Sequence, residues 1–278
     1  MAPDELEARP GEYPGELSGV AASVVMKVLY GARQARWDLS KAVSILATRF
    51  TRWSKGCDRA LHRMMSYIDC TSHLVLRGWV GDGPDDLLLR LFSDADFAGD
   101  RPSMKSTTGG YLALAGPNTW FPLGCKSKRQ TATSHSTTES EIVSADDVVR
   151  TIGLPALDLW EEVLKRKVEC HFHEDNQACL QVIKTGRNPT MRHITRTHGV
   201  NTSWLHERVL ADRIQPRYVD SKNQAADIFT KAFTSVPTFL HVRALIQVVD
   251  PSSVLQGSVV LACPVLPGGR LPNTRALH

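Results

Sequence analysis

The sequence predicts an α/β domain with a mixed five-stranded sheet flanked by helices, preceded by a small helical segment. Three observations support this fold class. Apolar residues recur at helical spacing over residues 17–69, whereas residues 87–125 contain three short apolar runs separated by turns. From residue 136 to residue 233, helical and strand patterns alternate, which is typical of an α/β domain. Turn-forming residues 81–85 divide the first region from the second, so we place the domain boundary at residues 85 and 86.

The composition of the 278-residue chain is that of a globular protein, with 42% hydrophobic and 22% charged residues. Its net charge of +4 allows a polyanionic partner without requiring one. The six cysteines form no C-x-x-C pair, and no apolar segment long enough for export follows the acidic N-terminus. We therefore expect an intracellular protein with reduced thiols that is not secreted and does not enter a membrane.

The region before the boundary is expected to contain a flexible leader and three helices. Residues 1–16 are acidic and contain proline and glycine, and the first helix is predicted from about residue 17 to residue 32. Asp38 is expected to cap the second helix. The second and third helices each have one apolar face: Val43, Leu46, Ala47 and Phe50 on the second, and Leu61, Met64, Met65 and Ile68 on the third.

After the boundary, the α/β domain is expected to occupy residues 86–235. Three strands are predicted over residues 87–93, 110–115 and 119–125, and the turn 116–118 (Gly-Pro-Asn) joins the last two. These strands are compatible with hairpins, so they are expected to form the antiparallel part of the sheet.

A basic loop leads into the second half of the domain; it contains Lys126, Lys128 and Arg129. Two overlapping capping-box patterns within residues 136–141 predict the start of a helix that runs to about residue 152. A second helix is predicted over residues 155–166 and is expected to pack beside the first.

The last elements bring two further acidic residues into the domain. A strand over residues 168–172 leads to Asp175, and the last strand, over residues 214–219, is placed at the sheet edge because it contains a proline. A final helix is expected to carry Asp227. Residues 236–278 are expected to be a partly disordered tail.

Four acidic residues lie in local patterns that favour a shared metal site: Asp94, Glu141, Asp175 and Asp227. Three of them adjoin apolar runs, where an unpaired carboxylate is costly to bury. Carboxylates that lie close together repel one another unless cations neutralise them, and oxygen ligands select hard ions such as Mg²⁺. Two Mg²⁺ ions about 4 Å apart can clamp a phosphodiester for attack by water. The four acids therefore indicate a nuclease.

Five sequence blocks carry a resemblance to a known family, in the order 93–100, 106–111, 136–141, 174–178 and 226–231. They read Ser-Asp-Ala-Asp-Phe-Ala-Gly-Asp, Ser-Thr-Thr-Gly-Gly-Tyr, Ser-Thr-Thr-Glu-Ser-Glu, Glu-Asp-Asn-Gln-Ala and Ala-Asp-Ile-Phe-Thr-Lys. With this order and spacing, residues 88–233 resemble the ribonuclease H domain of copia-type retrotransposon Pol polyproteins. Residues 17–80 resemble, more weakly, the C-terminal end of the reverse transcriptase and its connection to that domain.

The resemblance implies an endonuclease that hydrolyses the RNA strand of an RNA–DNA hybrid with two Mg²⁺ ions, which Mn²⁺ could replace. Carried over by position, its metal-binding and catalytic residues are Asp94, Glu141, Asp175 and Asp227. Asp94 would bridge both ions, and the other three acids would each bind one. The implied partners are the hybrid and the remainder of the Pol polyprotein, in a cytoplasmic virus-like particle or in the nucleus, with no small-molecule cofactor.

Two choices between neighbouring acids stay open. Glu139 competes with Glu141 as a ligand, although its place at the start of the helix favours a capping role. Asp96 competes with Asp94, because residues two apart on a strand share one face. In both cases the choice of Asp94 and Glu141 depends on the family pattern.

Four residues are expected to bind the substrate: Lys126, Lys128, Arg129 and Asn176. The three basic residues precede the helix that carries Glu141, where they could contact phosphate groups. Residues 219–223 contain no histidine, unlike the corresponding loop of cellular ribonucleases H, which puts histidine-assisted product release in doubt. The chain also lacks a Tyr-x-Asp-Asp motif, so it is not expected to copy RNA.

There are three other interpretations. The domain could be a catalytically inactive nucleic-acid-binding or structural remnant of a decayed retroelement. An integrase-like transferase would need its glutamate last among the three acids, whereas Glu141 comes second here. A zinc site could use His171 and His173 with Cys170 or Cys179, but no second ligand pair occurs at standard spacing.

Overall fold

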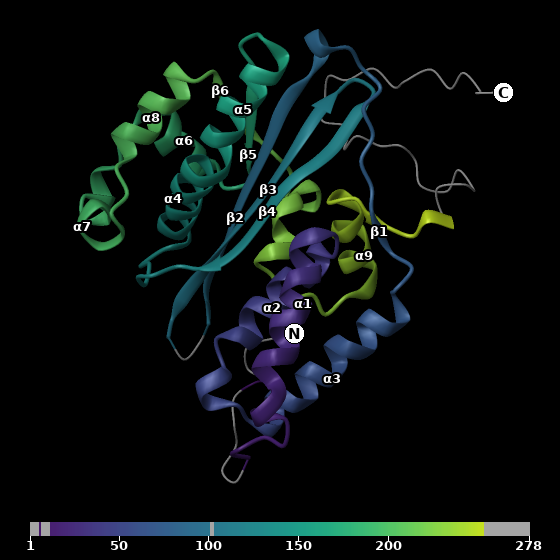
Figure 1. Ribbon diagram of the computed structural model, residues 1–278. Coiled ribbons are helices and arrows are strands. Elements are labelled where there is room, and N and C mark those ends of the chain that lie inside the picture. The colour runs from purple at the N-terminus through teal and green to yellow at the C-terminus, as the bar shows by residue number, and fades with distance from the viewer. Residues whose placement is uncertain (1–5, 7–11, 101–102, 253–278) are drawn as a thin grey trace, which may run out of the picture.

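The computed structural model describes residue 6 and residues 12–100 and 103–252 (Figure 1). Its central sheet has five strands in the order β4-β3-β2-β5-β6. Their bounds are Leu88–Asp100 (β2), Lys105–Gly116 (β3), Thr119–Arg129 (β4), Cys170–Glu174 (β5) and Ile214–Tyr218 (β6). Strands β2, β3 and β4 pair in antiparallel directions, while β5 runs parallel to both β2 and β6. The predicted α/β class with a mixed five-stranded sheet is confirmed.

The antiparallel strands extend well beyond the predicted apolar runs. The expected basic loop is instead the last part of β4, which pairs with β3 as far as Thr107 and Arg129. Lys126 is half-buried and Lys128 and Arg129 are exposed, so this part of the strand needs no apolar pattern. The prediction of a loop is wrong because backbone hydrogen bonds continue where the apolar pattern stops.

Helices α4 to α8 cover one face of the sheet (Figure 1). Their bounds are Thr137–Val148 (α4), Leu154–Leu164 (α5), Gln177–Thr185 (α6), Ile194–His198 (α7) and Thr202–Ala211 (α8). A π-helical turn, Val149–Gly153, joins α4 directly to α5, where two separate helices were expected. Pro155 lies in the first turn of α5, directly after this π-helical turn. The side chains of these helices and of the sheet form one buried apolar cluster.

The opposite face is partly covered by a stretch that was expected to belong to the disordered tail. Helix α9 (Val236–Leu245) is followed by strand β7 (Val248–Val249), which pairs with β1 (Val75–Leu76). Val242 and Ile246 are buried in the same cluster as aromatic residues of β2, β3 and β4. Residues 236–249, at the start of the partly disordered tail that was expected, are therefore packed against the sheet through their apolar side chains. Residues 253–278 lie outside the described residues.

The N-terminal helices are α1 (Ser18–Gln34), α2 (Ser40–Ala47) and α3 (Lys55–Cys70). They form a core of their own, which also includes Leu6 at 1% exposure, so this residue of the expected leader is packed. Asp38 does not cap α2. It lies in a 3-10 turn, where its carboxylate accepts hydrogen bonds from Arg36 at 2.9 Å and from the Tyr67 hydroxyl at 2.7 Å.

Ion pairs hold the helical segment against the end of the sheet. Lys41 Nζ lies 3.3 Å from Asp96 Oδ2 and 2.9 Å from Thr107 Oγ1, and Lys41 is 8% exposed. Arg49 Nη2 lies 3.0 Å from Asp100 Oδ1. The helical segment and the sheet are therefore joined through partly buried ion pairs close to the end of β2.

A short 3-10 helix, η8 (Ala225–Phe229), replaces the longer final helix that was expected. Gln224 caps it and donates a hydrogen bond of 2.9 Å from its side chain to the Ser93 carbonyl in β2. Gly109 of β3, which has no side chain, lies against η8. A Cβ atom there would lie only 2.9 Å from the Ala226 carbonyl oxygen, so glycine permits η8 to rest directly on the sheet.

Gly109→Ala should lower the free energy of unfolding by about 1–3 kcal/mol, the usual range for overpacking, because its methyl group meets the backbone of η8. Gly124→Ala is the matched control, since Gly124 lies in the neighbouring strand and none of the described atoms outside its chain neighbours lies within 4 Å of its Cβ position. Urea unfolding of both variants measures the difference. Equal stability of the two variants would contradict the close approach of η8.

Candidate active site

Three of the four predicted acids lie close together beside strand β2. Asp94 lies within this strand and pairs with Gly109 of β3. Asp175 directly follows β5, which runs parallel to β2, and Glu141 lies near the start of α4, which packs on the same strand. One carboxylate oxygen of each acid lies within 4.8 Å of the other two. Among the described residues, this is the only group of three or more His, Cys, Asp or Glu that is close enough to share a metal ion.

Asp227 is linked to Asp94 by the side chain of a lysine. Lys231 Nζ lies 2.7 Å from Asp227 Oδ1 and 3.3 Å from Asp94 Oδ1. The Thr230 hydroxyl donates a hydrogen bond to the other oxygen of Asp94, Oδ2. Asp227 is therefore a neighbour of Asp94, with the lysine ammonium group bound to both.

Hydrogen bonds fix the backbone of Asp94 relative to α4. The Ser93 hydroxyl donates to Ser144 Oγ at 2.9 Å, and the Ser144 hydroxyl donates to the Asp94 carbonyl at 2.8 Å. All three residues are buried. The helix that carries Glu141 is therefore held to β2 at the level of the acids, by directional bonds as well as by apolar packing.

Burial makes these acids costly to keep as anions. Burial, with the charges of Glu174 and Asp94, raises the pKa of Glu141 to about 11. Glu141 Oε2 is buried and has no hydrogen-bond partner within the described part of the chain. Burial, with the charge of Asp94, raises the pKa of Asp227 to about 7, although Lys231 opposes this shift. A bound cation would stabilise the charged form of each of these groups.

Glu139 lies at the cap of α4 and is committed to other partners. Its backbone N–H donates to Ser136 Oγ at 3.1 Å, while its carboxylate accepts from the His135 backbone N–H at 2.9 Å and contacts His198 Nε2 at 3.0 Å. Burial alone would raise the pKa of Glu139, but these hydrogen bonds and the nearby histidines hold it below its usual range. Of the two competing glutamates, it is Glu141 that lies beside Asp94.

Asp96 is likewise separate from the group of acids. Its carboxylate pairs with Lys41 of the helical segment, as described above. The two aspartates of β2 therefore have different surroundings, and Asp94 is the one that lies near Glu141 and Asp175.

Two residues of this site were missed at the level of the sequence. Glu174 is fully buried at the end of β5, where burial and the charges of Asp94 and Asp175 raise its pKa well above the usual value. Its position beside Asp175, at the end of a buried strand, could have revealed it. Lys231 follows Asp227 by four residues, and this spacing is a familiar one for an ion pair.

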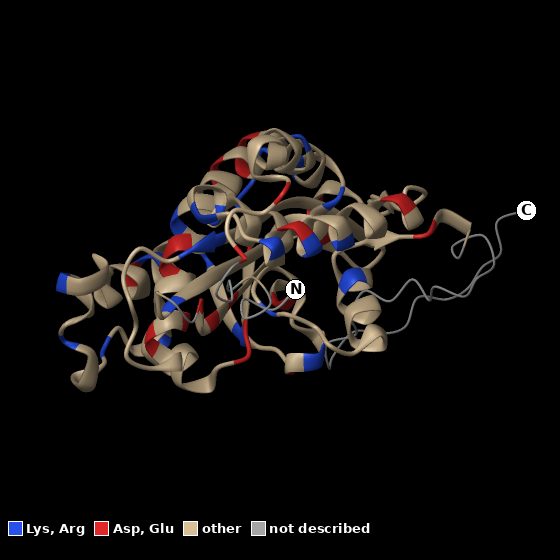
Figure 2. Cartoon of the chain, turned by 90° about the horizontal axis from the view of Figure 1, so that it is seen from below, with Lys and Arg blue, Asp and Glu red and all other residues tan. Residues whose placement is uncertain are grey.

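The four expected substrate-binding residues are largely engaged in structural contacts. Lys126 and Arg129 form ion pairs at 2.6 and 3.0 Å. The Asn176 side-chain oxygen accepts a backbone hydrogen bond of 3.0 Å and so caps α6. Lys128 is exposed on β4. Figure 2 shows basic and acidic residues interspersed along the chain.

The zinc interpretation finds no support in the arrangement of the described residues. The rings of His171 and His173 lie 6.4 Å apart, and His173 stacks on Phe92 at 4.5 Å. Burial lowers the pKa of both histidines. No group of close ligand atoms within the described ranges includes either of them.

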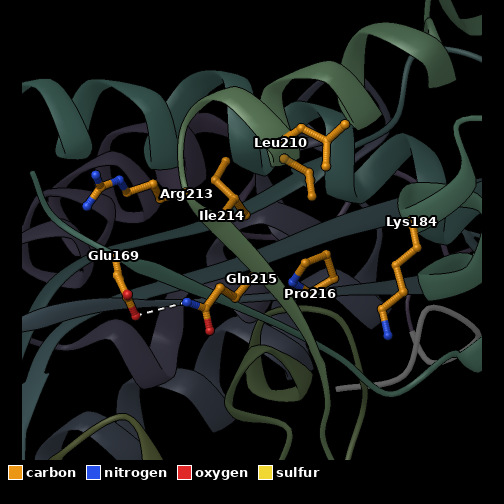
Figure 3. A pocket seen from close by; sticks show the side chains of 8 residues that line it. Glu169, Lys184, Leu210, Arg213, Ile214, Gln215 and Pro216 are labelled. Atoms are coloured by element: carbon orange, nitrogen blue, oxygen red, sulfur yellow. Dashed lines mark hydrogen bonds between the residues drawn. The ribbon is translucent and has the colours of Figure 1, made fainter.

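A pocket lies at the sheet edge, away from the acids. Its lining comes from β6 and the elements around it, and it includes Leu210, Arg213 and Pro216 (Figure 3). A hydrogen bond of 2.9 Å joins Gln215 to Glu169 at its rim. None of the four predicted acids contributes to this lining.

Substituting the two glutamates should have opposite effects on the metal-free protein. The pKa of Glu141 is about 11 in the folded state against 4.5 ordinarily, so above about pH 4.5 only the unfolded chain releases the proton and stability falls. Glu141→Gln removes this loss and should be more stable than the parent at pH 8 but not at pH 4. Glu139→Gln should lose about 1 kcal/mol at neutral pH, as expected for a weakened cap.

Urea unfolding in the presence of a chelator, at pH 4 and pH 8, measures both effects. The pKa of Glu139 is lowered in the folded state, so its stabilising contribution is present above its ordinary pKa and is lost in acid. The two variants should therefore differ most at pH 8. The reverse order of stability would show that the roles of the glutamates are exchanged.

No protein-family model matches the chain. The chain is 25% identical over 231 residues to the Retrovirus-related Pol polyprotein from transposon TNT 1-94 of Nicotiana tabacum, a match that covers 79% of this chain and 16% of that protein. It is 24% identical over 230 residues to the Transposon Ty1-NL2 Gag-Pol polyprotein of Saccharomyces cerevisiae, which covers 82% of this chain and 13% of that protein. The chain therefore spans less than a fifth of the length of these relatives.

Solved structures of ribonuclease H domains show a weak overall likeness. LC11-RNase H1 isolated from compost has a TM-score of 0.34 and 10% identity, covering 51% of this chain and 92% of that chain. The N-terminal RNase H domain of Rv2228c from Mycobacterium tuberculosis also has a TM-score of 0.34 and 10% identity, covering 52% and 91%. The resemblance predicted from the five sequence blocks is confirmed by the sequence relatives, which are Pol polyproteins of Ty1/copia-type transposons.

Proposed function

We propose that this chain is a ribonuclease H-like endonuclease that hydrolyses the RNA strand of RNA–DNA hybrids with two divalent ions, Mg²⁺ or Mn²⁺. The observation that carries the proposal is the convergence of three acids within 4.8 Å, with a fourth joined to Asp94 through Lys231. The acids come from four separate segments of the chain. Nothing in the packing of an apolar core requires so many buried carboxylates at one point.

The residues fit a hard divalent cation. All four donors are carboxylates, the ligand type that Mg²⁺ prefers. Glu141 Oε2 is buried without a hydrogen-bond partner among the described residues, and a bound cation would supply the partner that this oxygen needs. Asp94, Glu141 and Asp175 would hold one ion, and Asp94 and Asp227 would hold the other.

Bound ions of this kind activate the attacking water and stabilise the leaving 3′ oxygen of a phosphodiester. The protein's own part is to keep the acids in place. Thr230 orients the Asp94 carboxylate through its hydroxyl, and Ser144 fixes the backbone of the same residue. The low exposure of Glu141, 4%, limits competition by bulk water. The exposed Lys128 is our candidate for a contact with a substrate phosphate.

The natural context of this activity would be a Pol polyprotein inside the cell, in a virus-like particle or the nucleus. The relatives of the chain support this context. Within the described residues, none of the helices has the length and apolar character needed to span a bilayer. We propose residues 86–235 as the nuclease domain and residues 17–85 as the helical remnant of the reverse transcriptase, with the partly buried ion pairs of Lys41 and Arg49 joining the two.

Asp94→Asn should reduce cleavage of a labelled RNA–DNA hybrid in Mg²⁺ by several orders of magnitude, because it removes the charge shared by both ion sites. Far-UV circular dichroism should show an intact fold, since the change leaves the side-chain volume almost the same. Asp96→Asn is the matched control on the same strand, and most of the activity should remain in that variant. The parent protein should lose activity in excess chelator.

The same assay separates the alternatives. Cleavage of the hybrid, but not of duplex DNA or single-stranded RNA of the same sequence, is expected for the proposed enzyme. Binding of the hybrid without cleavage would support a catalytically inactive remnant. Full activity of Asp94→Asn would contradict the assignment of the acids, and loss of activity in Asp96→Asn alone would show that Asp96 is the ligand.

A further inference from the structure

Lys231 occupies the position where the proposed function places a metal ion. Its ammonium nitrogen lies 2.7 Å from Asp227 Oδ1 and 3.3 Å from Asp94 Oδ1. These two acids are the ones assigned to the second ion. A lysine between them and a divalent cation between them are alternatives, because both require the same carboxylate oxygens.

We propose that Lys231 competes with the second ion for its ligands. In the metal-free protein the lysine ammonium group neutralises Asp94 and Asp227, and the side chain must move away before an ion binds to these two acids. This inference rests on the proposed function, since it assumes that the acids hold divalent ions. It adds that the two ion sites are not equivalent: in the part of the chain that the structure describes, no lysine or arginine forms an ion pair with Glu141 or Asp175, whereas Lys231 pairs with both Asp94 and Asp227.

The local structure allows the side chain to move while the backbone stays in place. The Lys231 backbone N–H donates to the Asp227 carbonyl at 2.9 Å, and the Thr230 backbone N–H donates to the same oxygen at 3.1 Å. These bonds hold the end of η8. The Lys231 side chain is 38% exposed, compared with 2% for Asp94 and 10% for Asp227, so the lysine can extend into solvent more easily than either acid.

The charges also allow a divalent ion to replace the lysine ammonium group. Burial alone would lower the pKa of Lys231, but Asp94 and Asp227 raise it, so the lysine stays charged and stabilises both acids. A divalent ion brings twice the positive charge to the same oxygens. The free energy gained when the ion binds is then reduced by the loss of the lysine ion pairs. The apparent affinity for the second ion is therefore weaker than the two acids alone would give.

Magnesium titration of the metal-free full chain, followed by calorimetry without nucleic acid, tests this. Lys231→Met removes the internal cation and should tighten binding of the weaker ion about tenfold. In chelator, the same variant should melt at a lower temperature than the parent, because Asp94 and Asp227 then repel each other. Its rise in melting temperature with Mg²⁺ should exceed that of the parent.

Two further variants separate competition from a general structural role. Lys231→Arg keeps the positive charge and should bind Mg²⁺ about as the parent does. Lys126→Met is the matched control, since Lys126 is also ion-paired, at 2.6 Å to Asp147, and neither residue belongs to the group of acids. It should lose some stability with no change in magnesium affinity. If Lys231→Met does not fold, Lys231→Gln replaces it in the titration.

The outcomes distinguish this inference from the proposed function. If the parent binds Mg²⁺ and cleaves the hybrid, but removal of the lysine charge leaves the affinity unchanged or weakens it, only the competition is refuted. A loss of melting temperature that is the same with and without Mg²⁺ would also refute it. If neither the parent nor the lysine variants bind Mg²⁺ at millimolar concentration, the metal site is wrong and both proposals fall.

Discussion

The burial of several carboxylates around Asp94 is the constraint on which the rest of this structure depends. A buried anion needs a counter-charge or hydrogen-bond donors. The elements that meet here supply them: Thr230 donates to Asp94, Lys231 pairs with it, and Ser144 holds its backbone. Glu141 and Glu174 each keep an oxygen without a partner among the described residues. The protein itself thus neutralises only part of the negative charge of these carboxylates, and a bound cation would neutralise the rest.

The sheet explains why so many charges can be held at one point. Strand β2 is central, with β3 on one side and β5 on the other, so its position is set by hydrogen bonds along both edges. Helix α4 is tied to it through Ser144, and η8 is tied to it through Gln224. Hydrogen bonds to several elements therefore hold the backbone around the acids in place. Movement is left to the longer side chains, above all to the partly exposed Lys231.

The acids of β2 show that the role of a carboxylate depends on its partner. Asp94 faces Glu141 and Asp175, whereas Asp96 and Asp100 pair with Lys41 and Arg49 of the helical segment. The same strand thus serves the candidate site and the junction with the preceding helices. This junction would also make the stability of the nuclease domain depend on the helical segment, because removing it would leave Asp96 and Asp100 without these partners.

The sequence by itself determined the α/β class and, through the family pattern, the four candidate acids. These follow from local information, since apolar periodicity reports which residues are buried and the five blocks keep their own spacing. Only the tertiary structure decided the rest. The charged end of β4 and the packed residues 236–249 depend on pairing and burial supplied by distant segments. Likewise, Glu141 differs from Glu139, and Asp94 from Asp96, in what lies opposite each side chain. Those neighbours come from other parts of the chain, and no local pattern contains them.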